Sequence, residues 1–77
     1  MDYEKKNLTE LLMLVPHYIT YNKSMGVFKL QCSFSGKWRC IYDSIIGFDA
    51  CETPEDAVRQ VLEWVDSGMD VDRYLNE

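Results

Sequence analysis

The sequence has no apolar run long enough to span a membrane. Its longest one, Leu11 to Pro16, is far shorter than the roughly 20 residues that a membrane-spanning helix needs. The charged first residues are not followed by an apolar segment with a small-residue cleavage site, which argues against a signal peptide. The three cysteines are odd in number and poorly spaced for a disulfide framework, which favours reduced thiols. We therefore expect a cytoplasmic protein.

Acidic residues are missing from the middle of the chain. Residues 11–42 contain four basic residues and no acid, whereas residues 43–77 carry ten acids against two arginines. The net charge of −5 therefore hides a basic middle and an acidic end. Such a polarised charge distribution steers binding partners. With 77 residues, the chain is expected to form a single domain over residues 1–77.

Residues 2–15 are predicted to form the first helix. Three leucines and Val15 fall on one stripe at helical spacing. Pro16 ends the segment, because proline cannot continue a helix and disfavours helical backbone in the residue before it. Met13 and Leu14 lie off the stripe, so this helix has more apolar surface than one core face needs.

Two strands are predicted from alternation of apolar and polar side chains, over residues 27–33 and 37–43. A three-residue loop with Gly36 in the left-handed conformation keeps apolar side chains opposite one another. Residues 48–51 could add a short fourth strand. An earlier strand would join through a four-residue loop, residues 23–26. The pairs expected from that loop are Tyr21 with Phe28, Ile19 with Leu30, and His17 with Cys32.

The second long helix is predicted from its cap. Thr53 is the expected N-cap, Pro54 takes the first helical position, and Gly68 closes the helix. Residues 70–75 could add one further turn. The resulting fold class is α+β: a two-layer α-β-β-β-α arrangement, with the fourth strand as an option. Its strands form an antiparallel meander with both helices on one face, which is the topology of double-stranded-RNA-binding domains.

The expected register brings His17, Cys32 and Cys40 side by side, which raises the question of a metal site. Cys51 could supply a fourth zinc ligand. The alternative is that these are buried thiols beside one hydrogen-bonded histidine, and the sequence has no close pair of cysteines. We expect no metal and no cofactor. No nucleophile, base or phosphate-binding loop is evident either, so we expect no enzyme.

One face of the predicted sheet is polar and is expected to stay open. Basic side chains beside an exposed tyrosine could bind nucleic acid, but the acidic start of the second helix would repel phosphate. The acids of that helix could instead dock on a basic protein surface. The expected partner-binding residues are Tyr18, Thr20, Lys29, Gln31, Lys37 and Arg39 on the open face, and Glu55, Glu63 and Asp66 on the second helix.

Two segments resemble known families. Gly36-Lys37-Trp38-Arg39-Cys40, followed by Glu52-Thr53-Pro54-Glu55-Asp56-Ala57-Val58, is similar to small phage and prophage proteins of the ABA-sandwich type. Residues 48–57 also resemble the strand-to-helix junction of HicB-type antitoxins. The first resemblance implies a phage-encoded accessory protein in the host cytoplasm that binds a host protein, including components of bacterial defence. It carries no catalytic residue over to this chain.

These observations lead to two hypotheses of different kinds. The first is a non-enzymatic protein-binding module, a viral accessory protein that inhibits a bacterial defence complex as anti-CRISPR proteins do. The alternative is a nucleic-acid-binding or antitoxin-like regulator. We expect a host protein or complex as the partner, and neither nucleic acid nor a membrane. The surplus apolar residues Tyr3, Met13 and Leu14 could instead make a homodimer.

Overall fold

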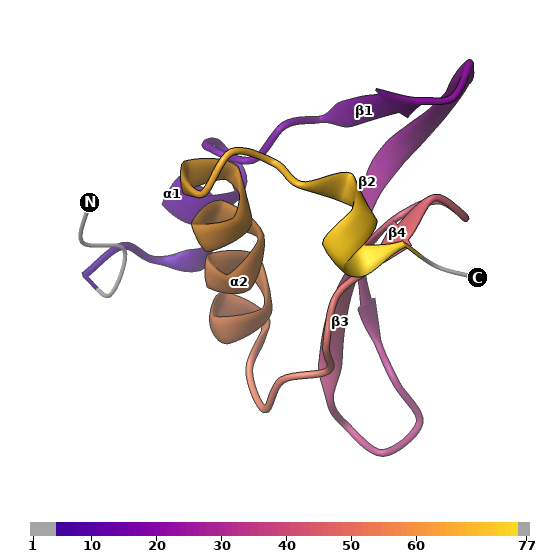
Figure 1. The fold of residues 1–77 in the computed structure, drawn as a ribbon. Coiled ribbons are helices and arrows are strands. Elements are labelled where there is room, and N and C mark those ends of the chain that lie inside the picture. Colours follow the sequence, from indigo (N-terminus) through magenta and orange to yellow (C-terminus); the bar gives the residue numbers. More distant parts are fainter. Residues whose placement is uncertain (1–4, 76–77) are drawn as a thin grey trace.

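The secondary structure runs helix, four strands, helix and a short 3-10 helix (Figure 1). The structure is a computed structural model and describes residues 5–75. The helices are α1 (Leu8–Leu12), α2 (Pro54–Asp66) and the 3-10 helix η1 (Val71–Tyr74). The strands are β1 (Tyr18–Tyr21), β2 (Ser24–Cys32), β3 (Trp38–Tyr42) and β4 (Ile46–Gly47).

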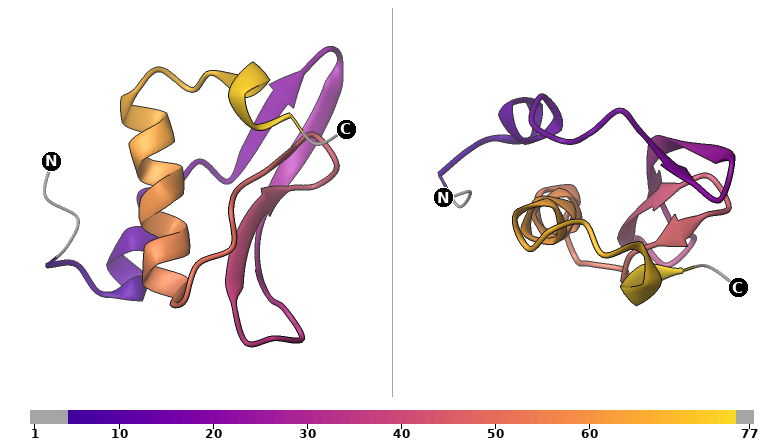
Figure 2. Two further views of the ribbon diagram at one scale, coloured as in Figure 1. Left: turned by 60° about the horizontal axis from the view of Figure 1, so that its bottom comes forward. Right: turned by 45° about the horizontal axis from the view of Figure 1, so that its top comes forward.

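The four strands form one antiparallel meander in the order β1-β2-β3-β4. Two views of the ribbon show that this sheet is curled into a half-barrel with α1 and α2 on one side of it (Figure 2). Helix α2 packs on β3, α1 packs beside α2, and η1 lies against β4. The α+β class and the antiparallel meander are thus as predicted. The likeness to double-stranded-RNA-binding domains is not confirmed, because the sheet has a fourth strand and is curled.

The two hairpins differ in how well their register was predicted. Between β2 and β3, Leu30 lies opposite Cys40 and Gly36 has a φ of 85°, as the three-residue loop requires. Between β1 and β2 the predicted loop is wrong: the turn is Asn22-Lys23, with φ of 51° and 68°. Two successive left-handed residues make the type of turn that matches the twist of a hairpin. Ile19 therefore lies opposite Gly26.

Both α-helices begin at a capping residue. In α2, Thr53 accepts a hydrogen bond from the backbone N–H of Asp56, as predicted. Within the described residues, helix α1 is shorter than predicted, because it begins after its N-cap Asn7 and ends at Leu12. Residues 2–4 of the predicted helix, Tyr3 among them, lie outside the described residues. Asn7 accepts from the N–H of Glu10, and the Glu10 carboxylate accepts from the N–H of Asn7. This capping box fixes where the helix starts.

The elements after β3, namely β4 and η1, are also partly as predicted. The short fourth strand forms at Ile46–Gly47 rather than at residues 48–51, where only a single bridge joins Cys51 to Trp38. The Asp43 turn, with a φ of 48°, brings the chain back earlier than we expected. Gly68 has a φ of 106° just after α2, and η1 supplies the expected further turn.

The core fills the space between α2 and the concave side of the sheet. Tyr42 lies at its centre, in ring contact with Phe28, Phe48 and Trp64. Its hydroxyl donates a hydrogen bond of 2.9 Å to the carbonyl of Pro16, so the buried oxygen has a partner. Burial raises the pKa of Tyr42, which stays neutral. The fully buried side chains are Leu11, Cys40, Tyr42, Ile46, Phe48, Val58, Val61, Leu62 and Trp64.

Candidate functional site

The convex side of the sheet is its outer face, and no element among residues 5–75 covers it (Figures 1 and 2). Side chains alternate along each strand, so the neighbours of the buried Ile19, Cys40 and Tyr42 point outward. The outer face consists of Tyr18 and Thr20 from β1, Met25, Val27, Lys29 and Gln31 from β2, and Arg39 and Ile41 from β3.

One half of the outer face is apolar. Tyr18 lies directly opposite Val27, and their exposed fractions are 59% and 44%. Met25, opposite Thr20, is 60% exposed. Large apolar side chains gathered in this way on a surface mark interaction sites more often than single ones do. Tyr18 and Thr20 were expected on this face, whereas Met25 and Val27 were not. The predicted loop, residues 23–26, placed Met25 outside the sheet.

The other half of the outer face is charged, and its Lys29 is paired with a carboxylate. The ammonium of Lys29 lies 2.7 Å from a carboxylate oxygen of Asp43. The other oxygen of Asp43 accepts the backbone N–H of Val27 at 2.8 Å. The hydrogen bond from Lys29, together with that from Val27, lowers the pKa of the Asp43 carboxyl. Asp43 therefore carries its charge on this face and offsets that of Lys29.

Arg39 is held against the sheet rather than extended from it. Its Nε donates to the carbonyl of Phe48 at 2.8 Å. The guanidinium lies over Gly47, where a Cβ atom would collide with it. Gln31, which pairs with Arg39 across the strands, is exposed. These contacts restrict how far the Arg39 side chain extends from the outer face.

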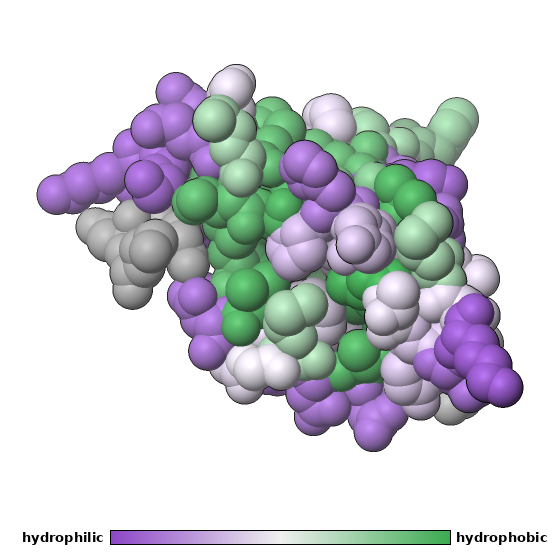
Figure 3. All heavy atoms as spheres, turned by 90° about the horizontal axis from the view of Figure 1, so that it is seen from above, coloured by the Kyte–Doolittle hydropathy of each residue, from purple (hydrophilic) through white to green (hydrophobic). Residues whose placement is uncertain are grey.

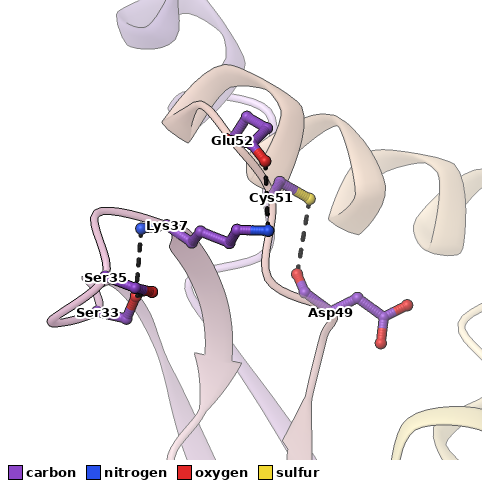
Figure 4. Close-up of polar contacts among 6 residues, drawn as sticks. All are labelled: Ser33, Ser35, Lys37, Asp49, Cys51 and Glu52. Carbon is purple, nitrogen blue, oxygen red and sulfur yellow. Dashed lines mark hydrogen bonds and ion pairs between the residues drawn. The ribbon is translucent and has the colours of Figure 1, made fainter.

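Lys37 lies at the end of the β2–β3 hairpin and pairs away from the outer face. Its ammonium is 3.3 Å from the carboxylate of Glu52, just before α2 (Figure 4). Its backbone N–H donates to the Ser33 hydroxyl, which is hydrogen-bonded to Ser35. The hairpin end is therefore ordered by its own side chains. Lys37 belongs to this end of the molecule and not to the apolar half of the outer face.

The expected acidic residues of α2 lie elsewhere. Glu63 and Asp66 are exposed and Glu55 is half-buried. Because α2 packs on the concave side of the sheet, these three are separated from the outer face by the core. The structure thus brings Tyr18, Thr20, Lys29, Gln31 and Arg39 onto one face and does not join the α2 acids to them.

The thiols and the histidine are not gathered into a metal site. His17 is level with Phe28, not with Cys32, because the Phe28 N–H donates to the His17 carbonyl. His17 is also exposed rather than buried against the core. Cys40 is buried, which raises its pKa to about 12, so it stays a thiol. Within residues 5–75, no three potential ligands come close enough to hold a metal.

An open pocket of about 540 Å³ lies at the β1–β2 turn, and sequence reasoning did not find it. Residues distant in the chain come together there, so no local pattern could have revealed it. Leu75 is held beside β4 by a bridge to Ile46. The residues that line the pocket are Tyr21, Asn22, Ser24, Met25, Ser44, Ile45 and Leu75.

Comparison with known proteins gives no relative for the chain. No family model matches it, and no curated protein and no solved structure is detectably similar. In the part of the chain that the structure describes, no helix combines the length and apolar character needed to cross a bilayer.

Proposed function

We propose that this chain is a non-enzymatic protein-binding module whose contact surface is the outer face of its sheet. The observation that carries the proposal is the exposed cluster of Tyr18, Met25 and Val27 on that face. Protein interfaces favour such a centre, with aromatic and aliphatic side chains surrounded by polar ones. Thr20, Lys29 and Gln31 are the polar neighbours of this cluster.

The electrostatics of the outer face favour a protein over nucleic acid. Phosphate binding needs cations that can approach a polyanion and release its counterions. Lys29 is paired with Asp43, and Arg39 is bonded to a backbone carbonyl. Lys37 is paired with Glu52. A protein partner can use such paired charges as a polar rim, whereas a nucleic acid would have to break the pairs.

The resemblance to small phage proteins suggests which partner to test first. We propose that the chain acts as a phage-encoded accessory protein on a host protein complex, and that a bacterial defence complex is the target, in the manner of anti-CRISPR proteins. Its action would be occlusion of a surface rather than chemistry, and the proposal involves no cofactor. The acids of α2, on the other side of the molecule, are the alternative contact surface.

Capture from a bacterial lysate with matched variants tests the proposal. Tyr18→Ser with Val27→Ser removes the apolar cluster, and Glu63→Gln changes the α2 surface as a control. We expect a partner held by the original protein and by Glu63→Gln, with at least tenfold weaker binding by the double variant, as at interface hot spots. Equal binding by all three proteins would contradict a contact through the outer face.

The antitoxin-like or nucleic-acid-binding alternative is kept because β2 and β3 carry two cations, Lys29 and Arg39, and Tyr18 offers a stacking surface. If the domain acted like a double-stranded-RNA-binding domain, it would bind RNA or DNA, and this binding would weaken steeply as the salt concentration rises. Gel-shift titrations with single-stranded and double-stranded probes at low and high salt measure this. Salt-dependent binding that Lys29→Gln weakens would favour the alternative over the protein-binding proposal.

A further inference from the structure

The two edges of the sheet differ in length and in how they are protected from further strand pairing. The β4 edge is only two residues long, and Leu75 bridges to Ile46 there. The β1 edge has four residues, Tyr-Ile-Thr-Tyr, with no charge, no proline and no bulge. Natural proteins protect exposed edges with such devices, because unpaired backbone groups template the addition of another strand. In residues 5–75 no element lies alongside β1 (Figures 1 and 2).

The hydrogen-bonding pattern identifies which backbone groups of β1 are free. Phe28 donates to the His17 carbonyl, so His17 and Phe28 form a hydrogen-bonded pair. In an antiparallel ladder such pairs alternate, so Ile19 and Tyr21 also bond toward β2. The N–H and C=O groups of Tyr18 and Thr20 therefore point away from the sheet. Outside the β1–β2 ladder, no backbone hydrogen bond reaches them within residues 5–75.

Exposed apolar side chains are concentrated around this edge. Of the eight large hydrophobic residues exposed within residues 5–75, six belong to the segment 13–27. Figure 3, which looks down on the side where Figure 1 shows α1 and β1, has apolar residues across much of this face. The six are Met13, Leu14, Tyr18, Tyr21, Met25 and Val27.

We propose that β1 pairs with β1 of a second copy of this chain, joining two sheets into one of eight strands. A two-fold axis at Ile19 places Tyr18 opposite Thr20 of the other copy, and Thr20 opposite its Tyr18. Each such pair exchanges two backbone hydrogen bonds, so all four outward groups of each strand find partners. The occupant is a second copy because this edge is complementary to itself.

The same axis also matches the apolar ends of the edge. Antiparallel pairing brings the α1 end of one copy, with Met13 and Leu14, toward the β1–β2 turn of the other, with Tyr21 and Met25. A strand pair alone buries less than the 1,200 Å² or so that stable interfaces need, and these side chains extend the contact. Like charges do not oppose it at the edge, since β1 carries no charged residue.

Sedimentation and amide hydrogen exchange test the pairing over a roughly hundredfold range of protein concentration, because mass action makes association depend on concentration. We expect the mass to rise toward twice the 9.1 kDa of one chain. In the associated form the amides of Tyr18 and Thr20 should become protected. Those of Ile19 and Tyr21 should be protected at every concentration, since they bond within the chain.

Three variants make the test specific. Thr20→Pro removes an outward N–H, and Thr20→Lys adds an edge charge; both should give a monomer with an unchanged circular dichroism spectrum. Gln31→Lys adds the same charge on β2, away from the edge, and should dimerise normally. If Thr20→Pro does not fold, Thr20→Lys decides. A chain that is monomeric throughout, or a dimer that Thr20→Lys leaves intact, overturns the pairing.

This pairing does not rest on the proposed function. Tyr18 and Thr20 belong to both surfaces, with their backbone groups on the β1 edge and their side chains on the outer face. The dimer uses the edge of β1 and needs no other protein, whereas partner capture uses the outer face. The Gln31→Lys control alters the face without the edge. Loss of one association and not the other therefore distinguishes failure of the dimer from failure of the protein-binding proposal.

Discussion

Asp43 is the residue on which the charged half of the outer face depends. It turns the chain between β3 and β4 with a φ of 48°, a conformation that aspartate tolerates better than most residues. From there its two oxygens reach Lys29 and the N–H of Val27. One carboxylate thus joins a turn to the strand that presents both halves of the outer face.

Asp43→Asn should make the free energy of unfolding less sensitive to acid pH. Lys29 and Val27 lower the pKa of the Asp43 carboxyl. Its contribution to folding stability is therefore fully present above the pKa that the same carboxyl has in the unfolded chain. That contribution is lost as the pH falls through the lower, folded value. Urea unfolding at pH 7 and pH 3 should show a smaller acid-induced loss for Asp43→Asn than for the original protein. Asp49→Asn is the control, and an equal loss in all three proteins would contradict the assignment.

At the scale of elements, α2 could be predicted from sequence and the β1–β2 turn could not. Thr53 and Pro54 are local signals of a helix start, and the structure uses both. The two possible loops of the first hairpin give registers that differ by an even number of residues. Both put the same side chains on the same face, so alternation could not choose between them.

Gly26 indicates why one of the two registers of the β1–β2 hairpin is favoured. We read it as a turn glycine, but it lies within β2, opposite Ile19. A Cβ atom there would come 2.6 Å from the backbone oxygen of Tyr42, so only glycine allows this approach of the strands. That constraint comes from β3 and is invisible in the hairpin's own sequence. For the same reason, Met25 was missed as part of the candidate site.

Helix α1 provides the element-scale prediction. At five residues it is too short to be stable alone, so its cap and the buried Leu11 must hold it. Asn7→Ala removes the side chain that accepts the Glu10 N–H and should reduce the free energy of unfolding by about 1 kcal/mol. Urea denaturation measures the loss. Thr9→Ala, on the exposed side of the same helix, should change stability by less than about 0.5 kcal/mol.

At the scale of the molecule, the chain has a closed side and an open side. Helix α2, η1 and the concave face of the sheet enclose an aromatic cluster in which Phe48 contacts Tyr42, Trp64 and Tyr74. The outer face and the β1 edge lie on the remaining surface. The sequence predicted this division from alternation alone. It could not predict which cations are paired, because Asp43 and Glu52 approach Lys29 and Lys37 only in the folded chain.

The hydroxyl of Tyr42 connects the core to the segment before β1. It donates from the core of β3 to Pro16, in the segment that leads from α1 into β1. Tyr42→Phe keeps the ring contacts but leaves the carbonyl of Pro16 without this donor, which should cost about 1–2 kcal/mol of unfolding free energy. Urea denaturation measures the loss, and faster hydrogen exchange in β1 would show where it acts. Tyr18→Phe removes the same atom from an exposed ring and should leave stability nearly unchanged. Equal effects of the two substitutions would mean that the bond to Pro16 does not hold β1 to the core.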